Sequence, residues 1–248
     1  MLGKTCAAAA AVFLLACTEI SGNKNDVLSV KFDTLASPSV VVGDTLRDTL
    51  GVIALPHVTA FNFQNDSVHS AVVRFRSPDG GISIDSLTGL IVGDSLRATS
   101  VRIIAAVGAL QAQQLLGLSL RPDTISAATA SPDTLKESLL DTTTNFSKGF
   151  SVKLVHHNAV DSAVPNYIVS FQIVSPPGSS AFDLVNEGGK VSIVDTTDAN
   201  GLAGRRVHLH LGGSEAVPDS VIVNATAKYR GVKVKGSPVR LVVKIVKS

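Results

Sequence analysis

Apolar and polar residues alternate in short runs from Val27 to the end of the chain. In residues 71–76, Ala71, Val73 and Phe75 fall on one face of an extended strand and two arginines on the other. A period of two is typical of a strand with one face buried. The same pattern predicts strands at residues 101–107, 169–173, 207–211, 221–227 and 239–245.

Turn-forming residues separate these runs, at 78–81, 176–178, 187–189, 198–201 and 212–213. Gly and Pro in such clusters favour tight turns, and no long helical period lies between them. Residues 111–118 could be read as a helix, but Gly117 and the neighbouring strands favour a strand. The pattern as a whole predicts an all-β chain of antiparallel sandwiches.

One short phrase recurs: an apolar residue, Gly or Pro, then Asp, then Ser or Thr, and an apolar residue. It occurs, with variations, at 42–46, 92–96, 122–125, 132–135 and 218–221. An Asp or Ser side chain can bond its own backbone and set the turn that starts a strand. We interpret the phrase as repeated turn chemistry, because a calcium site needs denser carboxylates.

The length of 248 residues suits two sandwiches of about 100 residues each. Residues 125–136, rich in Ala, Ser and Thr, are the best candidate for a linker. This places the first sandwich at 28–124 and the second at 137–248.

The first residues have the pattern of an export signal. Lys4 precedes an uncharged apolar run, residues 6–16, which is shorter than the ~20 residues of a transmembrane helix. The run ends in Leu-Leu-Ala-Cys, which resembles the lipobox of bacterial lipoproteins, although an ordinary secretory signal with a chance cysteine stays possible. In that family the cysteine, here Cys17, receives acyl chains such as palmitate and the signal is cleaved before it.

The resemblance implies a signal peptide at 1–16, a lipidated Cys17 and a polar tether at 17–27. By the sorting pattern of such lipoproteins, Thr18 in place of Asp favours the outer membrane. Cys6 would leave with the signal. Residues beyond Cys17 hold no further cysteine, so we expect no disulfide and no thiolate metal site.

Composition excludes several partners. Net charge is +2 and the basic residues are scattered, so we expect no nucleic acid to bind. The chain has no Trp, and Tyr167 and Tyr229 are far apart in sequence. This disfavours a carbohydrate module of the common kind, which uses aromatic platforms.

Residues 39–46, a Val-rich stretch followed by Gly-Asp-Thr and Leu, resemble the opening strand of bacterial Ig-like domains. In the second half, residues 194–203 resemble the "Thr-Asp-x-x-Gly-x-Ala" corner of the invasin/intimin type (Big-1), and 223–227 its next strand. The resemblance covers most of 135–246 and, more loosely, 28–122. It implies tandem Ig-like sandwiches and a role in cell adhesion or attachment.

Candidate chemistry is sparse. His208 and His210 alternate on a predicted strand, so they share a face about 7 Å apart. They could begin a zinc site, but it needs a third ligand, and solvated histidines are the simpler interpretation. His156 and His157 are adjacent and point to opposite faces, so they cannot chelate one ion together.

Residues 196–201 resemble part of an EF-hand loop, but the loop would begin with Thr and lacks its final Glu, so we read a turn at Asn200-Gly201. No phosphate-binding loop and no Gly-x-Ser-x-Gly motif occurs. We therefore expect no enzyme, no cofactor and no catalytic residue.

The sequence favours a non-enzymatic, lipid-anchored envelope protein whose Ig-like modules serve adhesion or act as spacers and binding modules. Its partners would be the membrane, through the anchor, and an unknown protein or surface ligand. One alternative is a structural subunit of an envelope complex. Another, from a different class, is a metal-dependent hydrolase that uses His208 and His210.

Overall fold

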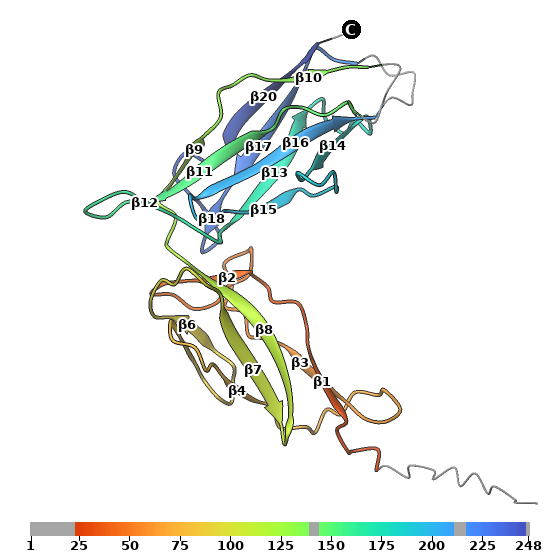
Figure 1. Cartoon of the computed structure of the whole chain (residues 1–248), viewed down its shortest axis with the longest axis vertical. Helices are drawn as coiled ribbons and strands as arrows, with labels where there is room; N and C mark the ends of the chain where they lie inside the picture. Colours follow the sequence, from red (N-terminus) through yellow and green to blue (C-terminus); the bar gives the residue numbers. More distant parts are fainter. Residues whose placement is uncertain (1–22, 139–143, 211–216, 247–248) are drawn as a thin grey trace, which may run out of the picture.

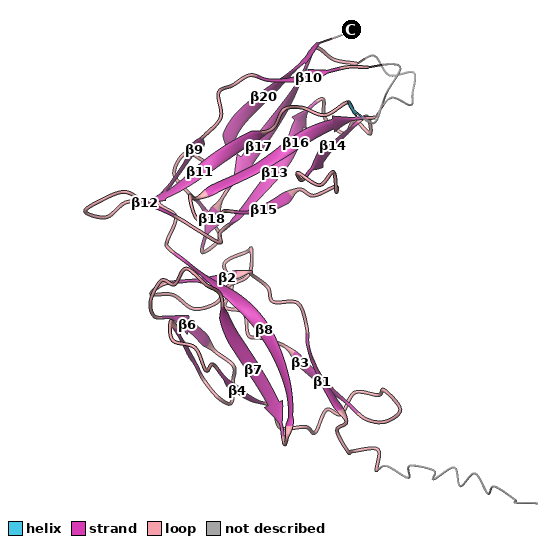
Figure 2. Cartoon of the chain, in the orientation of Figure 1, coloured by secondary structure: helices cyan, strands magenta, loops and turns pink. Residues whose placement is uncertain are grey.

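The computed structural model describes residues 23–138, 144–210 and 217–246. The expected signal peptide at 1–16, the lipidation site Cys17 and the first part of the tether lie outside these residues. The described chain folds into two β-sandwiches that follow one another along the long axis (Figure 1). Its regular structure is almost entirely strand (Figure 2), the described residues contain no α-helix, and no helix within them could span a membrane.

The first sandwich is built around a four-stranded sheet in the order β2-β8-β7-β4, beside the pairs β1-β3 and β5-β6. Residues 111–118 lie within the long strand β8, which pairs with β7, so the prediction of a strand rather than a helix there is confirmed. The strands are β1 (Ser29–Phe32), β2 (Ser39–Val41), β3 (Val58–Phe61), β4 (Arg74–Arg76), β5 (Ile82–Ile84), β6 (Ile91–Gly93), β7 (Val101–Val107) and β8 (Leu110–Ser119).

The second sandwich packs a sheet of order β10-β20-β17-β13-β15 against one of order β12-β11-β16-β14, with β9 paired to β11. A small hairpin, β18-β19, projects from it. Its strands are β9 (Thr124–Ala127), β10 (Asp133–Lys136), β11 (Phe150–His156), β12 (Ser162–Ala163), β13 (Ile168–Ser175), β14 (Phe182–Val185), β15 (Val194–Thr196), β16 (Leu202–Leu209), β17 (Ser220–Thr226), β18 (Lys228–Tyr229), β19 (Val232–Lys233) and β20 (Val239–Val246).

Each sandwich has its own apolar core, and the alternation in the sequence supplies it. In β17 the side chains of Val221, Val223 and Ala225 are fully buried, while the residues between them are half-buried. The Phe150 and Phe171 rings, from facing sheets, lie 6.0 Å apart between centroids in the second core. Phe32 and Phe75 make a similar pair in the first core, 6.5 Å apart. The expected fold class, two tandem Ig-like sandwiches, is confirmed.

Residues 125–136 are not a linker, contrary to the expectation from composition. They contain β9 and β10, and the side chains of Ile125 and Leu135 are buried in the second core. The small Ala, Ser and Thr side chains lie at the surface or the edges of the sandwich, while one large apolar side chain in each strand points inward. The connection between the sandwiches is instead the short stretch 120–123, between β8 and β9.

Both sandwiches depart from purely antiparallel pairing in the same way. An early strand runs parallel to the last strand of its sandwich: β2 to β8, and β10 to β20. The recurring Asp motif lies next to both contacts: Asp44 follows β2, and Asp133 begins β10. Asp44 and Asp133 each accept a hydrogen bond from the N–H of the following threonine, at 2.8 and 2.7 Å. The expected turn chemistry is therefore present at these two positions.

Candidate functional site: the junction between the sandwiches

The two sandwiches meet through side chains as well as through the connecting stretch. In the first sandwich, the turn after β2 (residues 42–51) faces the β18-β19 hairpin of the second (Figure 1). The C-terminal end of β8 faces the loop before β13. Asp44 is the centre of this junction. Its side chain is only 3% exposed, so its charge must be satisfied by protein groups.

Four groups converge on the Asp44 carboxylate. Oδ1 accepts hydrogen bonds from the Thr45 N–H and from Nε of Arg47, at 2.8 and 3.2 Å. Oδ2 accepts them from the Tyr229 hydroxyl and from Nε of Arg230, at 2.9 and 2.8 Å. The last two donors belong to the second sandwich, so one buried carboxylate ties the two sandwiches together.

The electrostatics follow from this coordination. Burial by itself would raise the pKa of Asp44, but the hydrogen bonds from Arg230, the Thr45 N–H, Tyr229 and Arg47 outweigh it and hold the pKa well below its ordinary value. Burial, together with the hydrogen bond to Asp44, raises the pKa of Tyr229. The junction therefore consists of an ionised aspartate and a neutral tyrosine.

Backbone atoms of the two sandwiches also come close together. A Cβ on Gly51, in the first sandwich, would lie 2.2 Å from the carbonyl carbon of Arg230. Gly51 has a φ of +86°, and Arg230 itself has a φ of 50°, an uncommon conformation for a non-glycine residue. The fit between the 47–51 turn and the hairpin thus requires a residue without a side chain.

A second set of contacts lies at the C-terminal end of β8. The Asn166 side chain donates a hydrogen bond to the Leu118 carbonyl at 3.1 Å, and the Asn166 carbonyl accepts one from the Ser39 hydroxyl. Asn166 has a φ of 57°, which Asn tolerates better than most residues. Together with Asp44, these bonds hold the junction at two separated points, so they restrict bending and twisting.

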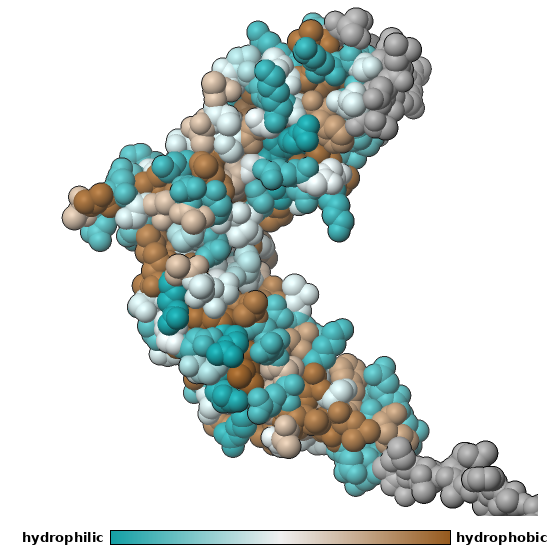
Figure 3. All heavy atoms as spheres, in the orientation of Figure 1, coloured by the Kyte–Doolittle hydropathy of each residue, from teal (hydrophilic) through white to brown (hydrophobic). Residues whose placement is uncertain are grey.

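Both tyrosines of the chain belong to this junction. Tyr167 donates a hydrogen bond from its hydroxyl to the Lys228 carbonyl at 2.6 Å, and burial raises the pKa of its hydroxyl. The two tyrosines, distant in sequence, border a groove of about 500 Å³ between the sandwiches. On one side of the molecule the outline is hollowed where the sandwiches meet (Figure 3).

The predicted histidine pair is present, but its surroundings differ from a zinc site. The His208 and His210 rings lie 4.2 Å apart between centroids, on the same side of the chain. His208 stacks on Phe146, and Nε2 of His210 lies 2.6 Å from a carboxylate oxygen of Asp183. No group of three His, Cys, Asp or Glu residues suited to a metal occurs in the described ranges.

His156 and His157 point apart, as expected, and each contacts a carboxylate. His156 Nδ1 lies 2.7 Å from Asp123, and His157 Nδ1 lies 2.6 Å from Asp161. The Asp123 carboxylate also accepts the backbone N–H of His157 at 2.9 Å. These contacts fasten the connecting stretch to β11, so we assign them a structural role.

The corner at residues 194–203 is also structural. The Thr197 hydroxyl is buried and donates to the Val164 carbonyl at 2.6 Å, while Asp198 accepts the N–H groups of Asn200 and Leu202. Gly201 has a φ of +74°, as the expected turn requires, whereas Asn200 does not share the positive φ. The motif builds a turn and offers no free carboxylate cluster for calcium.

Sequence reasoning identified Asp44 as a turn residue but missed its role between the sandwiches. Tyr229 lies 185 positions away from it in the chain. The only available signal was the placement of Tyr229, Arg230 and Gly231 in a short polar segment between two strands. Nothing in that segment alone identifies its partner.

Comparisons with protein-family models and with curated protein sequences found no match. Among solved structures, domains 4 and 5 of the S-layer protein SbsC are similar at 10% identity and a TM-score of 0.31, covering 88% of this chain and 96% of theirs. The Escherichia coli adhesin FdeC is similar at 12% identity and 0.29, covering 89% and 66%. Human protocadherin-24 EC1-2 gives 16% and 0.27, covering 90% and 100%. At these TM-scores the similarity carries no argument about function.

Proposed function

We propose that this chain is a non-enzymatic, lipid-anchored envelope protein, in which two Ig-like sandwiches form a stiff spacer that holds a binding surface away from the membrane. The observation that supports it best is the junction at Asp44. Sandwiches joined by a flexible linker would need no buried ion pair between them, whereas a spacer of fixed direction does.

The placement of the chain ends supports the same role. Residues that follow the expected anchor enter the first sandwich at the pole away from the junction, and β20 ends at the opposite pole of the second (Figure 1). From Cys17 to Lys24 the extended chain reaches roughly 25 Å. The first sandwich would therefore stand near the lipid surface, and the second would project outward to meet a partner in adhesion or attachment.

The anchor is tested by fractionation of cells that express the full chain. We expect the wild-type protein in the outer-membrane fraction, and Cys17→Ser in the soluble fraction or as an unprocessed precursor. Cys6→Ser is the matched control, because Cys6 would leave with the signal peptide and its loss should change nothing. If Cys17→Ser is processed and fractionates like the wild type, the anchor is wrong.

The proposed role in adhesion requires the second sandwich to be exposed at the cell surface. Protease added to intact cells should digest the second sandwich, whereas a subunit confined to the periplasm would survive until the outer membrane is opened. Complete protection in intact cells would therefore contradict adhesion and favour an internal envelope complex.

A further inference from the structure

The floor of the groove between the sandwiches is a flat set of neutral polar side chains. Ser170 on β13 lies directly opposite Thr226 on β17, and Gln172 lies opposite Asn224. These hydroxyl and amide groups can both donate and accept hydrogen bonds. Within the part of the chain that the structure describes, none of these four side chains is engaged in a hydrogen bond to another residue, so all four can bind a ligand.

The backbone of this floor is already paired. β17 lies between β13 and β20, and β13 lies between β17 and β15. An extended peptide cannot add itself as a strand to the face of a sheet, because strand addition needs a free edge. A ligand in this groove must therefore be recognised by side chains, through its own polar groups.

Cations border the groove at one end. Lys228 and Lys233 are exposed and directly opposite each other in the β18-β19 hairpin. Like charges in such a cross-strand pair repel one another, so an anion placed between them would relieve the repulsion. Arg47 and Arg230 line the same groove, but both are paired with the Asp44 carboxylate, so the lysine pair is the main charge left for a ligand.

Among the described residues, neither carboxylate of the groove is paired with the two lysines. Both oxygens of Asp44 are occupied by the junction. Asp48 uses Oδ1 to accept the N–H groups of Leu50 and Val52, at 2.9 and 2.8 Å. The groove thus offers an exposed lysine pair, beside two arginines held by Asp44, and a floor of hydroxyl and amide groups.

We propose that this groove binds an acidic polysaccharide, with its carboxylates at the Lys228–Lys233 pair and its hydroxyls on the floor of Ser170, Gln172, Asn224 and Thr226. Lysine and arginine bind carboxylates through charge-assisted hydrogen bonds, and neutral amides and hydroxyls match sugar hydroxyls. The inference rests on the proposed function, because it names the ligand of the binding surface that the spacer is proposed to hold away from the membrane.

The test uses the full chain in detergent and polygalacturonate as the probe, with binding measured by calorimetry at about 150 mM salt, where weak long-range attraction is screened. Dextran serves as the neutral polysaccharide and polyglutamate as the acidic peptide. We expect binding to polygalacturonate alone. Equal binding of polyglutamate would show attraction to charge only, and binding of none of the three would equally overturn the proposal.

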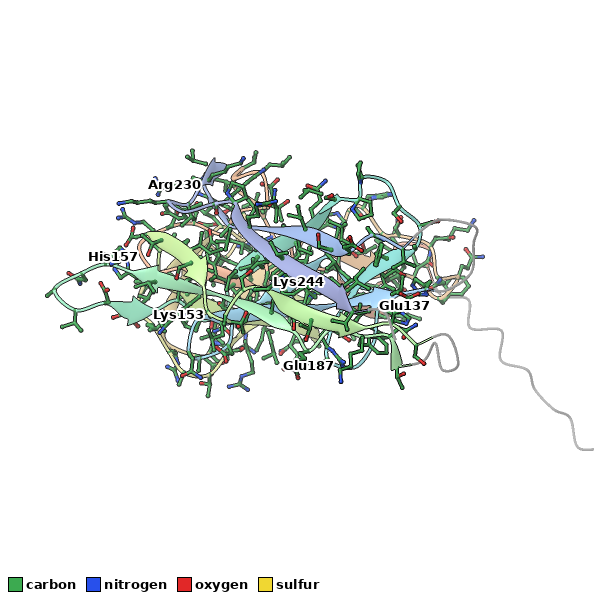
Figure 4. The ribbon with its side chains drawn as sticks, turned by 90° about the horizontal axis from the view of Figure 1, so that it is seen from above. Glu137, Lys153, His157, Glu187, Arg230 and Lys244 are labelled. Carbon is green, nitrogen blue, oxygen red and sulfur yellow. The ribbon has the colours of Figure 1, made fainter. Side chains whose placement is uncertain are left out.

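The variant that removes the site is Lys228→Gln with Lys233→Gln. Its matched control is Lys153→Gln with Lys244→Gln, which removes the same charge from exposed strand positions of the same sandwich. In the view along the long axis, both control lysines lie at a distance from Arg230, which borders the groove (Figure 4). We expect the first variant to weaken binding about tenfold or more, since two charge-assisted contacts are lost, and the control to bind like the wild type.

Equal weakening in both double variants would contradict a localised site. Thermal unfolding of each variant should match the wild type, because all four lysines are exposed. Binding does not depend on Cys17, so failure of the anchor and failure of the groove are separate outcomes.

Discussion

Gly51 of the first sandwich lies directly against the peptide of Arg230 in the second, so that a Cβ at position 51 would be 2.2 Å from the Arg230 carbonyl carbon. Real Cβ atoms essentially never approach another atom closer than 3.0 Å. This close approach therefore helps to set the relative position of the sandwiches, together with the Asp44 and Asn166 contacts.

Gly51→Ala should force the hairpin away from the 47–51 turn and loosen the junction. Small-angle scattering should then show a broader distribution of interatomic distances than the wild type. Gly108→Ala is the control: Gly108 also has a positive φ, of 58°, but nothing lies within 4 Å of a Cβ there. If the two variants scatter alike, the close approach does not set the orientation.

Asp44→Asn should uncouple the two sandwiches. Asn keeps the size of the side chain but loses the charge that binds Arg47 and Arg230. We expect this loss to lower the free energy that couples the sandwiches by about 1–2 kcal/mol, a modest value because both arginines are partly exposed to solvent. Calorimetry should then show the unfolding transitions of the two sandwiches further apart in temperature than in the wild type. Asp85→Asn, the same change at an exposed turn of the first sandwich, should leave the coupling intact.

The same residue predicts how the junction responds to acid. The pKa of Asp44 in the folded chain lies below the 3.8 of a free side chain. Its contribution to stability is therefore fully present above that value and is lost as the pH falls through the folded pKa. Scattering should therefore show no loosening while the pH stays above 3.8, and loosening only as the pH is lowered further toward the folded pKa of Asp44; Asp44→Asn should lack this step.

Leu135→Ala tests whether residues 125–136 belong to the second sandwich. The Leu135 side chain is fully buried, so its truncation should destabilise that sandwich by about 2–5 kcal/mol. Denaturant unfolding should show the loss in the second sandwich only. Leu115→Ala, at a position 60% exposed, should have little effect, and an equally small effect at Leu135 would support the linker interpretation.

Arg102 controls the ionisation of Asp79. Its guanidinium donates to both carboxylate oxygens, at 2.9 and 3.0 Å, and lowers the pKa of Asp79 to about 2. Arg102→Gln should return this pKa toward 3.8, as measured by carboxyl-carbon NMR. Asp85, whose pKa is lowered by the Thr88 and Leu87 groups, should titrate unchanged. An unchanged Asp79 would show that the ion pair does not form.

The sequence allowed the strands to be predicted because alternation directly reflects which face of a strand is buried. Val221, Val223 and Ala225 illustrate this: each is apolar, and each lies in the core. Residues 125–136 were misjudged because their one inward residue per strand, Ile125 or Leu135, is outnumbered by small polar neighbours. The average composition of a segment does not reveal a single buried apolar side chain of this kind.

The junction could not be predicted for a different reason. Asp44 has the same local phrase as Asp133, and both bind the following threonine. What distinguishes Asp44 is the arrival of Tyr229 and Arg230 from the other sandwich, which depends on how two finished sandwiches meet. Local sequence determines the turn, whereas the tertiary arrangement determines its additional partners.

The parallel pairing of β10 with β20 has a mechanical consequence. If a tethered chain is pulled by a partner, tension enters the second sandwich through β9, and beyond β9 it acts between β10 and β20. Because these strands run parallel over Asp133–Lys136 and Val243–Val246, tension slides one along the other and loads their hydrogen bonds together. In the first sandwich tension enters through β1, which pairs antiparallel with β3, and then loads β2 and β8 in the same shear geometry. We therefore expect single-molecule stretching to show high rupture forces, and a low-force, stepwise unzipping of either sandwich would argue against this load path.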